Sequence, residues 1–216
     1  MDIQFWLDKW QDKNIGFNQN SVNPWLKKYL SSLDLKPGAH IFVPLCGKSI
    51  DMHWLLAQGF NVIGVEVSSL ACEEFFADFA IEYSKQKQGG FTRYTSLTPG
   101  VILYCGDFFA LPRQYLSNVS AVYDRAALIA LPVVKRKVYV EHLLAIIPKH
   151  TKILMITLDY EQSTMSGPPF AVPNSEINDL FISRFSIKNI DHAKLQNIAE
   201  HLKQRGLQDS EENVFY

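Results

Sequence analysis

Short apolar runs and helical apolar patterns alternate along this chain, and the alternation predicts a parallel sheet. Residues 40–45 form a short, partly β-branched apolar run after a Lys-Pro-Gly turn, which is typical of a buried central strand. Residues 49–58 place apolar side chains at helical spacing and end before Gly59, which suits the end of a helix. Further strands are expected at 61–65, 101–104, 119–123, 152–158, 185–190 and 212–216, and further helices at 3–11, 21–33, 69–83, 132–147, 174–182 and 193–204.

This pattern predicts an open α/β sheet with helices on both faces. The two helical patterns ahead of the first strand predict an N-terminal helical cap over residues 1–35, followed by an α/β core over 36–216. A chain of 216 residues with 47% apolar content suits a single domain. Ligands of such folds bind beyond the carboxyl ends of the strands, where the strand order reverses. Candidate chemistry is therefore expected in the loops that follow the strands.

Charge and composition favour a small-molecule partner. The formal net charge is −1 and no basic run is longer than three residues, so neither nucleic acid nor an anionic membrane is an expected partner. The N-terminus lacks a basic region and no apolar stretch approaches the roughly 18 residues of a membrane span, so we expect a cytoplasmic protein. No long exposed apolar stripe is evident, and a monomer is expected.

Neither the cysteines nor the histidines predict a metal site. Three cysteines lie far apart in the sequence without a C-x-x-C spacing, and the six histidines show no ligand spacing. One alternative is nucleophilic catalysis by Cys46, because a helix N-terminus after it would lower its pKa. A small buried cysteine is the competing interpretation.

Two residues in the first half of the chain suggest a nucleoside site. Gly47 lies between the first strand and a helix, where the backbone can approach a ligand, although a plain tight connection explains the glycine equally well. Glu66 ends the second strand about 20 residues further on, where an acid can accept hydrogen bonds from ribose hydroxyls. The alternative for Glu66 is an exposed strand-end carboxylate.

Two further strand ends carry candidate side chains. Asp107 and Phe108 follow the third strand and offer a carboxylate beside a ring for an adenine, or simply an Asp cap on a short turn. Arg125 lies at the end of the next strand among apolar residues, where an unpaired charge is costly. Its anionic partner is either a ligand or the neighbouring Asp124.

An aromatic stripe marks the first helix. Phe5, Trp6 and Trp10 share this helix, and Phe17 follows it. Such a stripe is usually core. The alternative is a flat aromatic lid beside a purine or a sulfonium.

Taken together, five segments resemble the thiopurine S-methyltransferase family within the class I S-adenosylmethionine-dependent methyltransferases. They fall in the family's order and span nearly the whole chain, and PLCGKS replaces the glycine-rich loop of other methyltransferases. The segments are FWLDKWQ at 5–11, VPLCGKSIDMHWLLAQGFNVIGVEVS at 43–68, CGDFFALP at 105–112, YDRAALIAL at 123–131 and GPPFAVP at 167–173.

The resemblance implies a Rossmann-like fold with a seven-stranded, mostly parallel sheet, S-adenosylmethionine as cofactor and S-adenosylhomocysteine as product. It implies a thiopurine, or another aromatic or heterocyclic thiol, as the acceptor. Position by position, it implies cofactor contacts at Trp10, Leu45, Glu66, Asp107, Phe108 and Arg125. It implies acceptor contacts at Phe17, Arg125, Pro169 and Phe170, and no role is assigned to the basic residues His201, Lys203 and Arg205.

In the implied mechanism, methyl transfer to sulfur neutralises opposite charges, so a dry, aligned site should supply most of the acceleration without a strong general base. Arg125 is the expected catalytic residue, because its charge favours the anionic acceptor.

Several alternatives stay open beside this mechanism. The acceptor could be a selenium or tellurium species, or the chain could bind S-adenosylmethionine without catalysis. A nicotinamide oxidoreductase is disfavoured because the pyrophosphate-binding glycines are missing. Amine methylation is disfavoured because Gly167 offers no side-chain oxygen ahead of the prolines.

Overall fold

The computed structural model of this chain describes residues 2–98, 100–182 and 184–216. Its strands are β1 (His40–Val43), β2 (Asn61–Glu66), β3 (Tyr83–Gln88), β4 (Phe91–Ser96), β5 (Val101–Cys105), β6 (Val119–Arg125), β7 (Lys152–Asp159), β8 (Asn189–Lys194) and β9 (Glu211–Phe215). Its α-helices are α1 (Ile3–Gln11), α2 (Pro24–Tyr29), α3 (Ile50–Ala57), α4 (Ser69–Asp78), α5 (Val133–Ile146), α6 (Asn174–Phe181) and α7 (Glu200–Lys203). The short 3₁₀ turns that matter below are η1 (Leu30–Leu33), η2 (Phe108–Ala110) and η4 (Leu128–Ala130).

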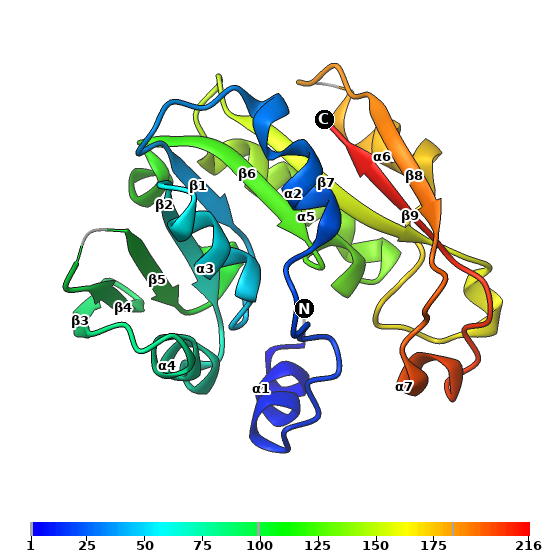
Figure 1. Ribbon diagram of the computed structural model, residues 1–216, viewed down its shortest axis with the longest axis horizontal. Coiled ribbons are helices and arrows are strands. Elements are labelled where there is room, and N and C mark those ends of the chain that lie inside the picture. Colours follow the sequence, from blue (N-terminus) through cyan, green and yellow to red (C-terminus); the bar gives the residue numbers. More distant parts are fainter. Residues whose placement is uncertain (1, 99, 183) are drawn as a thin grey trace.

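All the strands of the described residues join one sheet, in the order β3-β4-β5-β2-β1-β6-β7-β9-β8. The central strands β5, β2, β1, β6 and β7 are parallel neighbours. From β1 the chain adds β2 on one side and later β6 on the other, so the strand order reverses between β1 and β6. The expected ligand crevice therefore lies beyond the carboxyl ends of these two strands, at the lower centre of Figure 1, where α1 is found.

The expected α/β architecture is confirmed, but the expected seven-stranded, mostly parallel sheet is wrong. The described residues form nine strands, and the outer pairs on both sides of the sheet are antiparallel. The two additional strands form the β3–β4 hairpin, because the helix predicted to reach Tyr83 ends at Asp78 and the chain turns back at Gly89-Gly90. β3 is an almost wholly exposed polar edge strand, so it carries no apolar alternation that would have revealed it.

The C-terminal elements are shifted from their predicted places. The strand expected at 185–190 is β8, Asn189–Lys194, and the helix expected at 193–204 is reduced to α7. Ala193 and Lys194 pair instead with Glu212 and Glu211 of β9. The partner strand satisfies their backbone groups, and this tertiary pairing overrides the local helical pattern.

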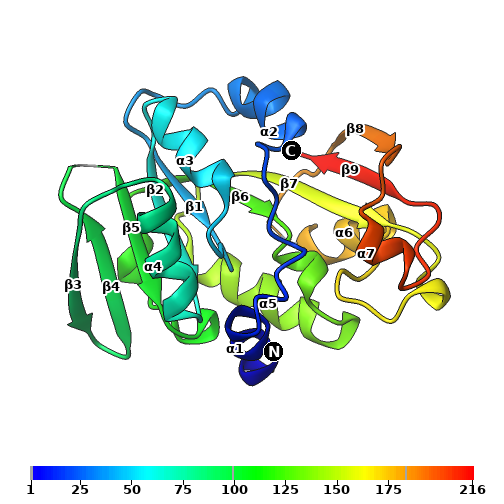
Figure 2. The same ribbon diagram turned by 60° about the horizontal axis from the view of Figure 1, so that its bottom comes forward.

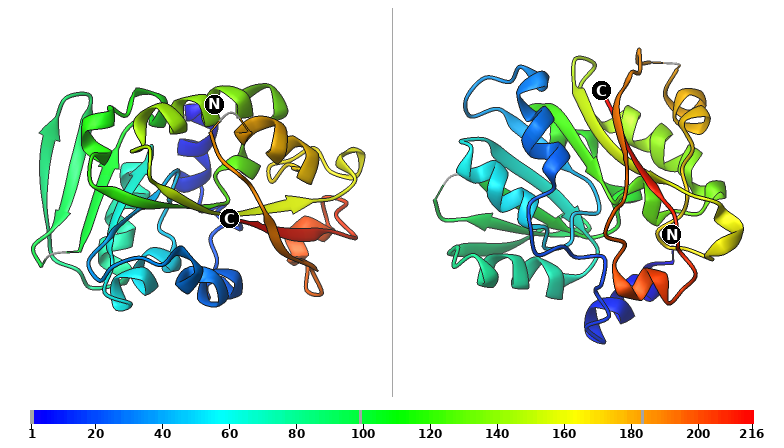
Figure 3. Two further views of the ribbon diagram at one scale, coloured as in Figure 1. Left: turned by 90° about the horizontal axis from the view of Figure 1, so that it is seen from above. Right: turned by 45° about the vertical axis from the view of Figure 1, so that its right-hand side comes forward.

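Helices cover both faces of the sheet, and each face has its own apolar core. Figure 3, left, shows the sheet edge-on with α5 and α6 above it and α2 and α3 below. The upper core joins Tyr139 and Leu143 of α5 to Phe181 of α6. The lower core joins α2, α3 and α4, and includes Met52 and Phe75.

The N-terminal region divides between this lower layer and the carboxyl edge. α2 begins at Pro24 after Asn23, whose side chain accepts hydrogen bonds from the first N–H groups of the helix. Leu26 of α2 and Leu33 of η1 are buried in the lower core. α1 lies apart from them, beyond the carboxyl ends of the central strands, as Figures 1 and 2 show. Within the described ranges, no helix has the length and apolar content needed to cross a membrane.

Candidate active site

The loop after β1 is a tight turn with two residues in left-handed backbone. Leu45 has φ +46° and Gly47 has φ +53°. A glycine adopts this conformation freely, whereas Leu45 must be held there by its surroundings. The intervening Cys46 N–H donates to the Val65 carbonyl of β2 at 3.0 Å. α3 follows with Ser49 as its cap, so its N-terminus lies at the carboxyl edge of the sheet.

Glu66 ties this loop to the end of β2. Its carboxylate accepts the Gly47 N–H at 2.9 Å through Oε2 and the Ser68 N–H at 2.8 Å through Oε1. Burial raises the pKa of Glu66, and these backbone donors partly oppose the rise. The side chain is 6% exposed, so the alternative of a solvated strand-end carboxylate is wrong. Because each carboxylate oxygen has two acceptor sites, capacity for hydroxyl donors remains.

Trp10 of α1 lies directly over the same loop. A Cβ placed on Gly47 would come within 3.1 Å of the Trp10 ring, so only glycine allows this close approach. Phe17 packs edge-on against Trp10 and Trp6, with ring centroids 5.6 and 5.4 Å apart. Trp10 is buried, whereas Phe5 is exposed and Trp6 is partly exposed, so the stripe packs over the carboxyl edge with only Trp10 fully enclosed.

A group of ion pairs fixes the N-terminal segment to this edge. Glu74 of α4 bonds to Lys13, which follows α1, and its Oε2 lies 3.0 Å from Nζ of Lys48 in the β1 loop. Lys48 also pairs with Asp78 at 2.9 Å. Burial opposes ionisation of Glu74, but the two lysines outweigh it and lower the Glu74 pKa. These pairs connect three segments that lie far apart in the sequence.

Asp107 and Phe108 differ in what they can offer a ligand. The Phe108 ring is 1% exposed and packs in the upper core against Tyr139 and His142, at 4.9 and 5.1 Å between centroids. It presents no free face for an adenine, and this placement corrects the expectation of a stacking ring. Asp107 caps η2 by accepting the Phe109 N–H at 3.0 Å, and its side chain stays partly exposed.

Arg125 ends β6 and is not paired with its neighbour. Asp124 points to the other face of the sheet, where it accepts the Tyr139 hydroxyl at 2.6 Å and the Leu128 N–H at 3.2 Å. Burial raises the pKa of Asp124 to about 6. Among the residues that the structure describes, no carboxylate lies within 4.0 Å of the Arg125 guanidinium. The alternative of a structural Asp124–Arg125 pair is therefore excluded.

The loop expected to border the acceptor returns to the end of β6. Phe170 donates its N–H to the Ile129 carbonyl of η4 at 2.7 Å, four residues after Arg125. The Pro169 carbonyl accepts the Tyr160 hydroxyl at 2.7 Å. The loop is thus held beside the strand that carries Arg125.

α7 and the turn that follows it contact the two expected acceptor segments, which the sequence did not reveal. Arg205 donates to the Pro168 and Gly167 carbonyls, both at 2.8 Å. The His201 ring lies 3.0 Å from the position of a Cβ on Gly16, directly before Phe17. α7 therefore lies against the loop that follows α1. The basic character of this region was visible in the sequence, but its contacts depend on the shortened helix.

The alternative of Cys46 as a nucleophile is not supported. Burial, and next the negative charge of Glu66, raise the Cys46 pKa well above its ordinary value. A neutral buried thiol is a poor nucleophile. In the parts of the chain that the structure covers, no three His, Cys, Asp or Glu side chains group as a metal site requires.

Over its full length, the chain matches known proteins of the family that its sequence motifs resemble. Residues 1–216 match the sequence model of the thiopurine S-methyltransferase (TPMT) family. A relative from Nitrosospira multiformis, named thiopurine S-methyltransferase, is 44% identical, with 100% of this chain and 97% of the relative covered. A relative of the same name from Pseudomonas paraeruginosa is 40% identical, with 100% and 98% covered.

Solved structures support the fold. The chain superposes on a magnesium protoporphyrin IX methyltransferase from Synechocystis PCC 6803, solved with S-adenosylhomocysteine, with a TM-score of 0.64. The alignment covers 100% of this chain and 99% of that one at 12% identity. At this identity the similarity concerns the fold.

Proposed function

Because the chain belongs to the thiopurine S-methyltransferase family, we propose that it transfers the methyl group of S-adenosylmethionine to the sulfur of a thiopurine or another aromatic or heterocyclic thiol. S-adenosylhomocysteine is the second product. When bound, S-adenosylmethionine supplies an electrophilic methyl group on a positively charged sulfur.

The residues at the ends of β1, β2 and β5 would hold the cofactor. Glu66 suits the ribose, because its fixed carboxylate keeps acceptor capacity for two hydroxyls. Leu45 would contribute backbone contacts to the cofactor from the tight loop, and Trp10 would cover the cofactor. Asp107 keeps an accessible carboxyl group on the adenine side, whereas the buried Phe108 ring is left out of this assignment.

The acceptor would lie between Phe17, the loop at Pro169 and Phe170, and the guanidinium of Arg125. One observation carries this proposal: Arg125 ends a central strand at the carboxyl edge, and no carboxylate of the described residues lies within ion-pair distance of it. A partly buried, unpaired cation favours an anionic ligand such as a thiolate. Exclusion of water by the aromatic and proline side chains would strengthen this attraction.

A combined binding and turnover experiment tests the proposal. Tryptophan fluorescence should report S-adenosylhomocysteine binding to the wild type, and radiolabel should pass from S-adenosylmethionine to 6-mercaptopurine. Glu66→Gln should weaken binding about 10- to 100-fold, the usual cost of a lost hydrogen bond to a charged group. Glu82→Gln, at an exposed carboxylate, is the matched control. Cofactor binding without any transfer to a thiol would instead indicate a non-catalytic binding protein.

We also propose that residues 1–216 form one domain that acts as a cytoplasmic monomer. The part of the expected cap that covers the cofactor would be α1 and its following loop, since α2 and η1 belong to the lower core. Sedimentation velocity should give a single monomeric species, and a stable dimer would contradict this assignment.

A further inference from the structure

Glu212 of β9 is a carboxylate near the site to which no role has been assigned. Arg125 pairs in register with Ile156 of β7, and Ile156 pairs with Val214 of β9. Since paired residues share a face and alternate residues return to it, Glu212 lies on the same face of the sheet as Arg125. β6 and β9 are separated by β7 alone, about 10 Å apart. Glu212 is also nearer the carboxyl end of β7 than Val214 is, because it pairs with Leu158.

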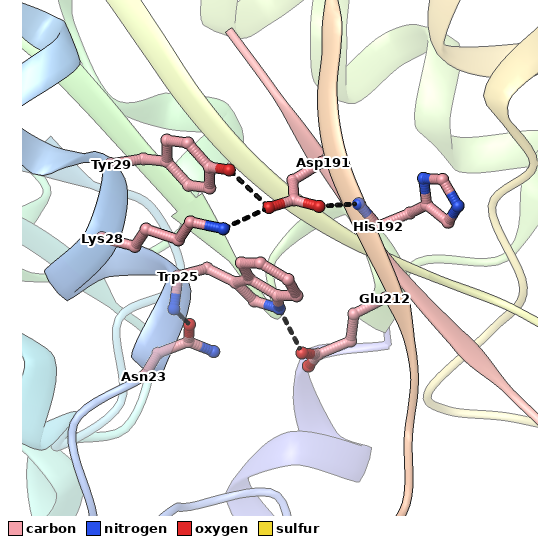
Figure 4. Close-up of polar contacts among 7 residues, drawn as sticks. All are labelled: Asn23, Trp25, Lys28, Tyr29, Asp191, His192 and Glu212. Atoms are coloured by element: carbon pink, nitrogen blue, oxygen red, sulfur yellow. Dashed lines mark hydrogen bonds and ion pairs between the residues drawn. The ribbon is translucent and has the colours of Figure 1, made fainter.

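The carboxylate is held in place from α2. The Trp25 indole N–H donates to Oε2 of Glu212 at 2.8 Å, as Figure 4 shows. α2 is in turn tied to β8, because Lys28 bonds to Asp191 at 2.6 Å and the Tyr29 hydroxyl donates to the same carboxylate. The orientation of Glu212 is thus set by contacts that do not involve the acceptor.

The surroundings of Glu212 make its carboxylate easier to protonate than an exposed one. Burial raises the Glu212 pKa, while the Trp25 N–H and the charge of Arg125 oppose the rise. On the same face, Tyr123 of β6 is bonded to Asp51 of α3 at 2.9 Å.

Three further charged side chains on this face belong to α2, β8 and β7, and Lys152 of β7 donates to the Leu33 carbonyl. Lys28 of α2 and Asp191 of β8 are paired with each other. Glu211 alternates with Glu212 and so points to the opposite face, where it lies 3.5 Å from His192.

Methylation of a protonated acceptor at sulfur releases one proton. A heterocyclic thiol that enters as its neutral thione carries the proton on a ring nitrogen. When its sulfur gains the methyl group, the S–CH₃ bond forms, the bond between the methyl group and the donor sulfur breaks, and that electron pair stays on S-adenosylhomocysteine. The ring N–H proton must leave for a base before this step, so that the sulfur attacks in its anionic form.

We propose that Glu212 accepts this proton from the acceptor, while Arg125 holds the acceptor's sulfur in its anionic form. The carboxylate becomes a carboxylic acid and later releases the proton to water. This assignment rests on the proposed function. It adds a base for protonated acceptors only, because an acceptor that is already a thiolate needs none.

Two acceptors separate this role from a structural one. 6-Mercaptopurine carries a proton at neutral pH, whereas an aromatic thiol with a para nitro group is a thiolate there. Glu212→Gln should lower kcat for 6-mercaptopurine about 100-fold, within the usual range for a lost general base. It should change kcat for the nitro-substituted thiol and the affinity for S-adenosylhomocysteine less than threefold. Glu211→Gln, one residue away on the opposite face, is the matched control and should leave both reactions unchanged.

Equal losses with both acceptors, or no loss with either, would overturn the role of Glu212. If the wild type methylates neither acceptor, the proposed function itself fails, which is a distinguishable result.

Trp25→Phe provides a second, independent measurement. This variant keeps the ring and the carboxylate but removes the N–H that lowers the Glu212 pKa, so the acid limb of the kcat profile should move to higher pH. Ultraviolet absorption of 6-mercaptopurine bound to the S-adenosylhomocysteine complex should show the deprotonated ring in the wild type and the protonated ring in Glu212→Gln. An unmoved acid limb, or identical spectra for the two proteins, would contradict the proposal.

Discussion

Two adjacent residues at the end of β6 show how side-chain direction separates structure from function. Asp124 is fully buried and bonded to Tyr139, whereas Arg125 projects to the opposite face. Because successive residues of a strand point to opposite faces, the nearest carboxylate in sequence cannot neutralise Arg125. Its charge is therefore available to a ligand at the carboxyl edge.

The account predicts distinct effects of substitutions at Arg125. Arg125→Ala should lower kcat/KM for the thiol about 10- to 100-fold, since a charge-assisted contact with the acceptor is lost. Arg125→Lys should recover only part of this loss, because lysine lacks the planar fork of donors. Affinity for S-adenosylhomocysteine, measured by calorimetry, should change much less. An equal loss of cofactor affinity would place Arg125 in the cofactor site instead.

Asp124 makes the effect of Tyr139→Phe depend on pH. The folded-state pKa of Asp124 is raised to about 6, so its contribution to stability is full below its ordinary pKa of 3.8 and is lost as the pH rises through about 6. The Tyr139 hydroxyl stabilises the ionised form. Its removal should cost about 1–3 kcal/mol of unfolding free energy at pH 7.5 and clearly less at pH 5, measured by urea denaturation. Equal losses at both pH values would refute this pairing.

Residue roles were predictable where strand position alone identifies them. Glu66 and Arg125 end two parallel strands, β2 and β6, on either side of β1, so their common edge follows from the fold. The burial of the Phe108 ring in the upper core was not predictable, because its sequence position does not show which face of the chain the ring takes. No sequence feature indicated a role for Glu212. Its position near Arg125 arises only because β9 returns antiparallel beside β7.

Among the elements, the loop after β1 stands in the place of a glycine-rich turn. It contains one glycine, Gly47, where a side chain would collide with Trp10. Leu45 and Gly47 both take left-handed backbone, and the Gly47 N–H is bonded to Glu66 while its Cα lies beneath Trp10. The loop shape is thus coupled to both the Glu66 carboxylate and the Trp10 ring.

Gly47→Ala should therefore damage binding more than stability. A Cβ there would crowd the Trp10 ring at 3.1 Å and strain the backbone, so affinity for S-adenosylhomocysteine should fall at least tenfold and the tryptophan emission should shift. Gly59→Ala is a matched control, because Gly59 also has positive φ but nothing lies within 4 Å of its Cβ position. It should cost about 1 kcal/mol of stability without affecting binding. Similar binding losses in both variants would contradict this coupling.

Strands with continuous apolar runs were predicted close to their observed bounds, because burial on both faces leaves a clear pattern. The β3–β4 hairpin and the short α7 were not. β3 exposes nearly all its side chains, and the region before α7 is drawn into β8 by pairing with β9. Local sequence carries little information about either event.

At the scale of the whole molecule, the candidate site is assembled from both ends of the chain. Lys13 and Lys48 both pair with Glu74, and Arg205 donates a hydrogen bond to the Gly167 carbonyl. The β1 loop, the N-terminal segment and α7 thus converge on the edge where the strand order reverses. The sequence predicted this edge, but not the contacts that close it, because they join residues distant in sequence.

The central claim is that this edge catalyses methyl transfer to sulfur. The most direct test is radiolabel transfer from S-adenosylmethionine to 6-mercaptopurine, hypoxanthine and adenine, which present sulfur, oxygen and nitrogen on the same ring. The account predicts methylation of 6-mercaptopurine at a rate at least about 100-fold above the other two, because the acceptor site favours a soft anionic sulfur. Comparable transfer to hypoxanthine or adenine, or no transfer to 6-mercaptopurine while S-adenosylhomocysteine still binds, would contradict it.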